Sequence, residues 1–265
     1  MRLSVSALAW SADEEASALA LLSTEGLRCM EHVPARSHAA AAEIRARGLA
    51  VVAFQALLFG TTNLHLFRGD TERRALEQHL LSVCETAATF GARALVFGSP
   101  KNRFIDPAFI ERDAAFELAR EFFGRLGRAA ADLGTTICLE PNPAAYGCNF
   151  LTTTAETAEF VASIASPGVK LNVDAGALVM NGEDPKLVLA DRLALIGHVH
   201  ASEPELVPVG SLPETAAAHR RLSETLRGIG YDGVVSIEMM RPQAEPFEVA
   251  VRRAIRFTRE AYGAD

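Results

Sequence analysis

The sequence predicts a (β/α)₈ barrel, or TIM barrel, that spans residues 1–265 as a single domain. Short apolar runs alternate with longer amphipathic segments along the whole chain, which is typical of repeated strand–helix units and a parallel sheet. The 265 residues are 49% hydrophobic, enough for one large core, and no low-complexity tract or linker divides them. Several apolar runs end on a carboxylate or a histidine, and a barrel gathers such strand ends on one face.

A doubly wound open sheet is the competing fold. No Gly-x-Gly-x-x-Gly segment follows any of the expected strands, although that segment often marks the dinucleotide site of such sheets. Polar residues at the ends of so many strands also require a face on which they converge. We therefore prefer the barrel.

In the first half of the chain, four apolar runs indicate strands at residues 3–10, 27–33, 49–55 and 94–98. The amphipathic segments between and after them predict helices over residues 13–23, 39–47, 72–90 and 107–133. The first run resembles the apolar part of a signal peptide, but it reaches the acidic residues 13–15 too soon and has no convincing cleavage site. We interpret it as a strand.

In the second half, strands are expected at residues 137–140, 169–174, 195–200 and 233–238. Pro141 and Pro143 end the first of these, because proline cannot continue a sheet ladder. A helix opens at Thr154 with Glu156 in its first turn, where a negative charge is favourable. Further helices are expected over residues 185–189, 213–227 and 246–262, each beginning at a proline, as the first helical position favours.

The composition excludes several classes of function. A formal net charge of −7 repels nucleic acid and anionic membrane surfaces, and no apolar run is long enough to span a bilayer. The four cysteines lack the spacing of a metal finger, and two of them lie in apolar helix or strand patterns. We therefore expect free thiols in a reducing compartment, and hence a cytoplasmic protein.

Each of the last four strands delivers one side chain that can bind a metal ion: Glu140, Asp174, His200 and Glu238. A single carboxylate after a strand is often only a helix cap or an ion-pair partner. Four metal-binding side chains at the ends of four successive strands are unlike a set of unrelated caps and ion-pair partners, because each strand is otherwise apolar. Three carboxylates repel one another unless a cation lies between them, and three oxygen donors with one imidazole suit Mn²⁺, Mg²⁺ or Co²⁺, with Zn²⁺ as an alternative.

The segments around these tips carry a resemblance to a known family. Residues 139–142 (Leu-Glu-Pro-Asn), 172–174 (Asn-Val-Asp), 198–200 (His-Val-His) and 236–238 (Ser-Ile-Glu) resemble those of the xylose isomerase-like TIM barrels, a group of sugar isomerases and epimerases that includes ketose 3-epimerases and inosose dehydratases. The resemblance implies that Glu140, Asp174, His200 and Glu238 hold one divalent ion, Mn²⁺ above all. It also implies assembly as a homodimer or homotetramer.

In the epimerases of that family, the two glutamates at the positions of Glu140 and Glu238 also move protons. We therefore expect them to be the catalytic acid and base, acting on a hydroxy-ketone through a metal-stabilised enediolate. The chain departs from the ketose 3-epimerases at two positions. Ala177 and Leu206 stand where those enzymes usually carry a histidine and an arginine that handle substrate oxygens, so a free ketohexose is a less secure substrate.

Other polar side chains at strand ends are candidates for binding a carbohydrate-like substrate. Our candidates are Gln55, Lys101, Asn142, His198 and Glu203. Lys101, with the neighbouring Asn102 and Arg103, offers charge for a phosphate or carboxylate, although a solvated loop is an equally good explanation. His198 projects to the same side as His200 but one layer deeper, which favours a partner of the ligand or substrate over a ligand. Glu31 is expected to bind substrate or to pair with an arginine.

Three other functions remain open at this stage. A metal-dependent dehydratase of an inosose- or dehydroshikimate-like ketone begins with the same proton abstraction, and needs an added acid such as His198 or Glu203. A DNA-repair endonuclease shares the barrel, but the charge and the lack of a second His/Asp cluster disfavour it. A binding protein without metal is the last alternative.

Overall fold

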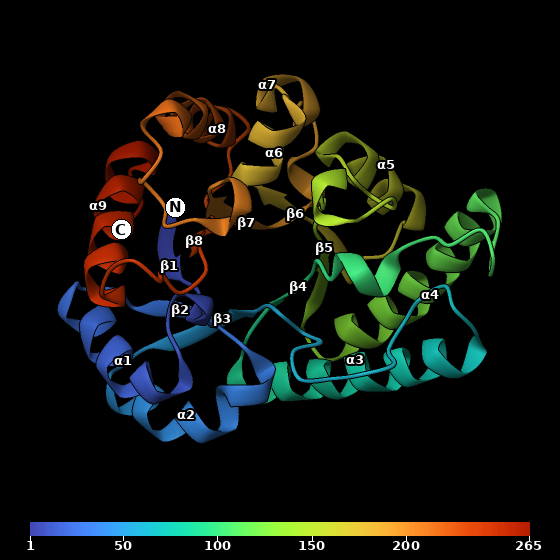
Figure 1. Ribbon diagram of the computed structural model, residues 1–265, viewed down its shortest axis with the longest axis horizontal. Coiled ribbons are helices and arrows are strands. Elements are labelled where there is room, and N and C mark those ends of the chain that lie inside the picture. Colours follow the sequence, from blue (N-terminus) through green and yellow to red (C-terminus); the bar gives the residue numbers. More distant parts are fainter.

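The computed structural model describes residues 1–265 and arranges eight strands around a central axis (Figure 1). The strands are β1 (Arg2–Val5), β2 (Cys29–His32), β3 (Ala50–Phe54), β4 (Ala94–Phe97), β5 (Thr136–Leu139), β6 (Val169–Asp174), β7 (Ile196–Ser202) and β8 (Val234–Glu238). All neighbours pair in parallel in the order β1-β8-β7-β6-β5-β4-β3-β2. A parallel bridge between Ser6 and Glu31 joins the two ends of this order. The predicted (β/α)₈ barrel is confirmed.

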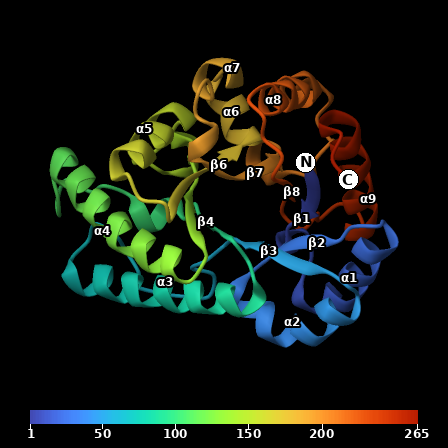
Figure 2. The ribbon, with the colours of Figure 1, turned by 180° about the vertical axis from the view of Figure 1, so that it is seen from behind.

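The helices form a ring outside the strands, which Figure 2 shows from behind. They are α1 (Glu15–Thr24), α2 (Pro34–Ala46), α3 (Asp70–Phe90), α4 (Arg112–Asp132), α5 (Thr154–Ile164), α6 (Ala175–Asn181), α7 (Pro185–Val188), α8 (Ala216–Gly228) and α9 (Phe247–Tyr262). One hydrophobic cluster of 66 buried residues draws on both strands and helices. None of the helices is long and apolar enough to cross a membrane. All four cysteines are free and buried, as predicted.

Four elements differ clearly from the prediction. Helix α2 begins at Pro34 rather than at Ala39. The first strand stops at Val5, because the Ser6 hydroxyl accepts a hydrogen bond from the Leu8 amide and caps a 3₁₀ turn over Ala7–Ala9. Helix α4 begins at Arg112, since Pro107 starts only a turn. Helix α6 was not predicted, and follows β6 without a loop because Asp174 is its N-cap.

The strand register places the polar tips at one end of the barrel. Asp174 pairs with His200 across β6 and β7, and Ser202 pairs with Glu238 across β7 and β8. Because side chains alternate along a strand, residues two apart project to the same side. The carboxyl ends of the parallel strands therefore carry a set of polar side chains that converge on the barrel mouth.

Candidate metal centre

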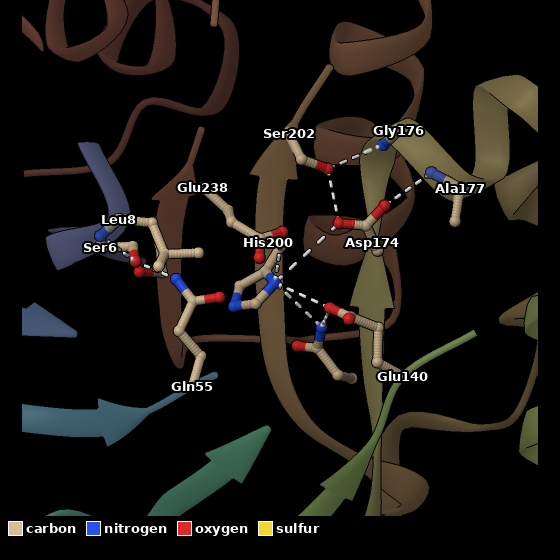
Figure 3. Close-up of polar contacts among 12 residues, drawn as sticks. Ser6, Leu8, Gln55, Glu140, Asp174, Gly176, Ala177, His200, Ser202 and Glu238 are labelled. Carbon is tan, nitrogen blue, oxygen red and sulfur yellow. Dashed lines mark hydrogen bonds and ion pairs between the residues drawn. The ribbon is translucent and has the colours of Figure 1, made fainter. Parts of the chain in front are cut away.

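The side chains of Glu140, Asp174, His200 and Glu238 meet at the mouth of the barrel. One ligand atom from each lies within 4.8 Å of the other three. Figure 3 shows the carboxylates around one edge of the imidazole. His200 Nδ1 lies 3.0 Å from Glu140 Oε1, 3.1 Å from Glu238 Oε2 and 3.9 Å from Asp174 Oδ2. Donor atoms on opposite sides of a cation bound at about 2.1 Å are about 4.2 Å apart, so this spacing suits one divalent ion.

The opposite edge of the His200 ring is held by Glu31, which lies deeper in the barrel. Both Glu31 oxygens approach His200 Nε2, at 3.2 and 3.1 Å. Glu31 is completely buried, and one of its oxygens also accepts a hydrogen bond of 2.7 Å from the Ser236 hydroxyl. A carboxylate that accepts the Nε2 proton leaves the Nδ1 lone pair free to bind a metal ion.

Charge repulsion among the tips appears in their pKa values. Burial raises the pKa of the Glu238 carboxyl to about 8, with Glu140 and Asp174 adding to the rise and His200 opposing it. Burial and the charge of Glu140 raise the pKa of Asp174 to about 6. Burial alone would lower the pKa of His200, but Glu238 and Glu31 outweigh it and raise that pKa well above its ordinary value. The site therefore favours positive charge.

Asp174 uses its two oxygens differently. Oδ1 accepts the Ala177 amide at 2.6 Å and so caps α6, while Oδ2 accepts the Ser202 hydroxyl at 2.5 Å. The Ser202 oxygen in turn accepts the Gly176 amide at 2.9 Å (Figure 3). Asp174 is therefore a helix cap, and this role does not exclude metal binding because Oδ2 also lies 3.9 Å from His200 Nδ1.

Glu140 is positioned from three sides. The Asn172 amide donates to its Oε1 at 2.7 Å, and the buried guanidinium of Arg103 donates to its backbone carbonyl at 2.5 Å. Gly98, at the end of β4, provides the space for Oε2, since a Cβ added there would collide with that oxygen. The sequence reasoning missed Asn172 and Gly98. The spacing of two residues from Asp174 was the available signal for Asn172.

Above the four tips lies a cavity of about 380 Å³, within the range of small-molecule sites. Gln55 and Asn142 line it, together with Tyr146, which follows Glu140 in the sequence. Lys101 is exposed and is not among the lining residues. Asn102 and Arg103 face elsewhere: the Asn102 amide donates to the Leu64 carbonyl, and Arg103 is fully buried.

His198 and Glu203 also lie outside the cavity lining. His198 Nε2 is 3.6 Å from Glu31, inside the barrel and one layer below the tips, as its position in the strand indicated. Glu203 is fully buried, accepts the Gly210 amide at 3.1 Å and lies 3.6 Å from His219. Glu31 pairs with histidines and Ser236 rather than with an arginine, which corrects one expectation.

Together, the fold and the site define an eight-stranded barrel with a buried carboxylate–imidazole cluster at the carboxyl ends of its strands. The chain belongs to the family described as xylose isomerase-like TIM barrel, whose sequence profile matches residues 17–261. No curated protein sequence matches the chain.

Solved structures share the barrel over nearly the whole chain. D-psicose 3-epimerase from Clostridium cellulolyticum, solved with D-tagatose, has a TM-score of 0.80 at 16% identity and covers 99% of each chain. The 3-keto-D-glucoside 4-epimerase from E. coli has a TM-score of 0.77 at 19% identity, covering 97% of this chain and 99% of that one. The IOLI protein, solved with a zinc atom, has a TM-score of 0.70 at 18% identity, covering 99% and 98%. At these identities the likeness establishes the fold.

Proposed function

We propose that the chain is a divalent-metal-dependent isomerase or epimerase of a sugar or a sugar-like hydroxy-ketone. The observation that carries this proposal is the placement of Glu140 and Glu238. The two glutamates follow or end strands that lie three places apart in the sheet, and both line the same cavity beside His200. Two carboxyl groups that reach one small cavity from different sides can serve opposite faces of a substrate carbon.

Glu140, Asp174, His200 and Glu238 would hold the metal ion, and their donor set fits it. Three oxygen donors and one nitrogen donor suit Mn²⁺ first, with Mg²⁺, Co²⁺ and Zn²⁺ as alternatives. Burial first, and then the neighbouring carboxylates, raise the pKa values of Asp174 and Glu238, and a cation among these side chains would offset that repulsion. The bound cation would polarise the substrate carbonyl and so make the neighbouring C–H more acidic.

The proton transfers belong to the two glutamates. One carboxylate takes the proton from the carbon next to the carbonyl, and the other glutamate, as the acid, returns a proton from the opposite face. Return to the same carbon inverts it. Return to the former carbonyl carbon moves the carbonyl, provided that the neighbouring hydroxyl passes its proton to the former carbonyl oxygen. Asn172 and Arg103 hold Glu140 in place for this transfer.

The geometry favours this reaction over the alternatives. A dehydratase needs an acid at the leaving hydroxyl, and neither His198 nor Glu203, the residues considered for that role, lines the cavity. An endonuclease needs a basic surface for DNA, whereas no lysine or arginine lines this cavity and the net charge is −7.

Deuterium exchange tests the proposal directly. The Mn²⁺-loaded protein is incubated in D₂O with a panel of 2-ketoses, and NMR follows deuterium entering the carbons next to the carbonyl. We expect exchange with at least one ketose, lost after chelation and restored by Mn²⁺. Glu140→Gln and Glu238→Gln should each lower the rate at least about 100-fold, while Glu117→Gln on the surface of α4 should match the parent. No exchange across the panel, or full activity in both site variants, contradicts the proposal.

A further inference from the structure

The charge of the cavity restricts its substrate. Four charged residues line it, and all are acidic: Glu140, Asp174, Glu205 and Glu238. No lysine, arginine or histidine contributes to the lining. A divalent cation would offset only two of these four negative charges. A phosphate or carboxylate on the substrate would therefore enter a field of its own sign without a counter-charge.

The basic residues nearest in sequence to the lining residues Ser99 and Pro100 do not offset the negative charge of the cavity. Lys101 belongs to the 3₁₀ turn Pro100–Arg103 beside the cavity, but its side chain is exposed and outside the lining. Arg103 is fully buried beneath the chain, where it donates to the Glu140 carbonyl. Neither residue presents a guanidinium or ammonium group to a ligand above the metal centre.

One sector of the cavity wall carries two leucines, on either side of Glu238 at the end of β8. Leu8 follows β1 and Leu206 follows β7, and β8 lies between these two strands in the barrel. The loop after β8 is tied to the same sector, because the Met240 amide donates to the Leu206 carbonyl at 2.9 Å. Leu8 is fixed by its turn: Arg36 donates to the Ala7 and Trp10 carbonyls on either side of it, each at 3.1 Å.

The facing sector carries the uncharged polar side chains of the lining, together with Glu140 and the apolar Ala56, Val96, Pro100 and Pro141. Gln55, Ser99, Asn142 and Tyr146 line it from the loops after β3, β4 and β5, which are neighbours in the barrel. Amide and hydroxyl groups of this kind bind substrate hydroxyls by donating and accepting hydrogen bonds. The uncharged hydrogen-bonding groups therefore lie together on one side of the cavity, and the two leucines lie on the other side.

Leu206 is held in the cavity wall at the expense of backbone strain. Its φ is 54° and that of Glu205 is 60°, in the left-handed region that side chains other than Asn, Asp and Gly rarely adopt. The Glu205 amide donates to the Tyr146 hydroxyl at 2.8 Å, which holds this segment against the cavity. Strained residues of this kind cluster at ligand sites, where the conformation serves to place a side chain.

From these observations we infer that the substrate is an uncharged hydroxy-ketone with a deoxy carbon at one end, seated against Leu8 and Leu206. The inference rests on the proposed function and narrows its substrate class. The hydroxyls of the substrate face Gln55, Ser99, Asn142 and Tyr146, and its carbonyl faces the metal centre. A terminal hydroxyl placed against the two leucines would lose its hydrogen bonds to water and gain none from them. A terminal methyl group there has no hydrogen bonds to lose.

The test compares matched ketoses. The probes are 2-ketohexoses of both D and L series, their 6-deoxy counterparts and their 6-phosphates. Two readouts are used with the Mn²⁺-loaded protein: the kcat/KM of deuterium exchange in D₂O, and thermal stabilisation by each ketose. Within one configuration, we expect the 6-deoxy ketose to exceed its parent by about tenfold or more, as apolar contacts typically discriminate. The 6-phosphate should be the poorest of the three by both readouts.

Leu206→Asn tests the assigned residue. Asparagine tolerates positive φ better than leucine, so this variant adds an amide without adding strain. The preference for the deoxy ketose should fall to within about twofold, while Leu206→Met should retain it. Leu187→Asn is the matched control, since Leu187 is 77% exposed and lies outside the cavity. If Leu206→Asn fails to fold, Leu8→Asn serves the same purpose.

The outcomes separate the two proposals. A parent ketose or 6-phosphate that equals or exceeds the deoxy ketose in both readouts overturns the substrate inference, while its deuterium exchange still supports the isomerase. Exchange with no ketose overturns the isomerase, and the order of thermal stabilisation then decides the inference by itself. An unchanged preference in Leu206→Asn also overturns the inference.

Discussion

Glu31 lies directly beneath His200, with its two carboxylate oxygens 3.2 and 3.1 Å from Nε2. Burial alone would raise the pKa of Glu31, but His200 and His198 outweigh it and lower that pKa far below its usual range. Glu31 is therefore a permanent acceptor for the Nε2 proton. The imidazole edge that faces the cavity is fixed by this contact at the opposite edge.

Glu31→Gln should weaken metal binding without unfolding the barrel. Glutamine keeps the shape of the side chain but removes its charge, and its amide can present a donor to Nε2. We expect Mn²⁺ affinity to fall about 10- to 100-fold, the usual effect of changing a partner of a metal ligand. Titration calorimetry of chelator-treated protein measures it, and Glu117→Gln, on the surface, is the control. Unchanged affinity would show that Glu31 has only a packing role.

Gly98→Ala should disturb Glu140 selectively. The added Cβ would collide with Glu140 Oε2, so the carboxylate must leave the position that it holds beside His200. Mn²⁺ affinity should fall by about tenfold or more, in the range for altered surroundings of metal ligands. Gly228→Ala is a matched control, because nothing lies within 4 Å of a Cβ added there. Equal affinities in the two variants would mean that Glu140 is not held where the structure places it.

Ser202→Ala should destabilise the start of α6. The Ser202 hydroxyl links the Gly176 amide to Asp174 Oδ2, and its removal leaves that buried amide without a partner. The cost is about 1–3 kcal/mol in the free energy of unfolding. Urea denaturation of the metal-free protein measures it. Ser82→Ala on α3, an exposed serine bonded only to a carbonyl of its own helix, should change stability little.

The metal-free protein should lose stability as the pH rises. In the folded chain the pKa of Asp174 is about 6 and that of Glu238 about 8, above ordinary values of 3.8 and 4.5. A raised pKa means that the folded state holds the proton more tightly than the unfolded state. This contribution is complete below about pH 4 and is lost as the pH rises through about 6 and then about 8. The raised pKa of His200 acts in the same direction.

Thermal melts between about pH 5 and pH 8.5 should show this loss in chelator-treated protein. Added Mn²⁺ should restore stability, and its effect should grow over the same interval, because metal ligands bind in their deprotonated form. Glu238→Gln should remove the part of the dependence centred near pH 8. A metal-free protein whose melting temperature rises steadily through this range would contradict the assignment.

The barrel and the polar residues at its strand ends could be predicted because a strand end has a local sequence signal. An apolar run is followed there by proline, glycine or a charged residue. The choice of Glu203 shows where such reasoning stops. His198, His200 and Ser202 share one side of β7 through the two-residue period, so Glu203 falls on the other side and packs against His219. The alternation of side chains along β7 therefore indicated Ser202, rather than Glu203, as the residue that lies beside Asp174.

Contacts between distant segments could not be predicted in the same way. Glu31 and His200 are 169 residues apart, and their pairing depends on closure of the ring between β1 and β2. The strain at Leu206 and the space at Gly98 depend likewise on neighbouring loops and strands. The helix α6 was missed because the helix-cap explanation for Asp174 was set aside in favour of a ligand role.

The double use of Asp174 gives the metal centre a reporter on the outside of the barrel. Since one carboxylate holds the first turn of α6 and faces the cation position, an ion that orders Asp174 should also slow hydrogen exchange at the Ala177 amide. The exchange rate of this amide would then report how much of the metal site is occupied. Different metal ions could be ranked by their effect on that rate without any substrate.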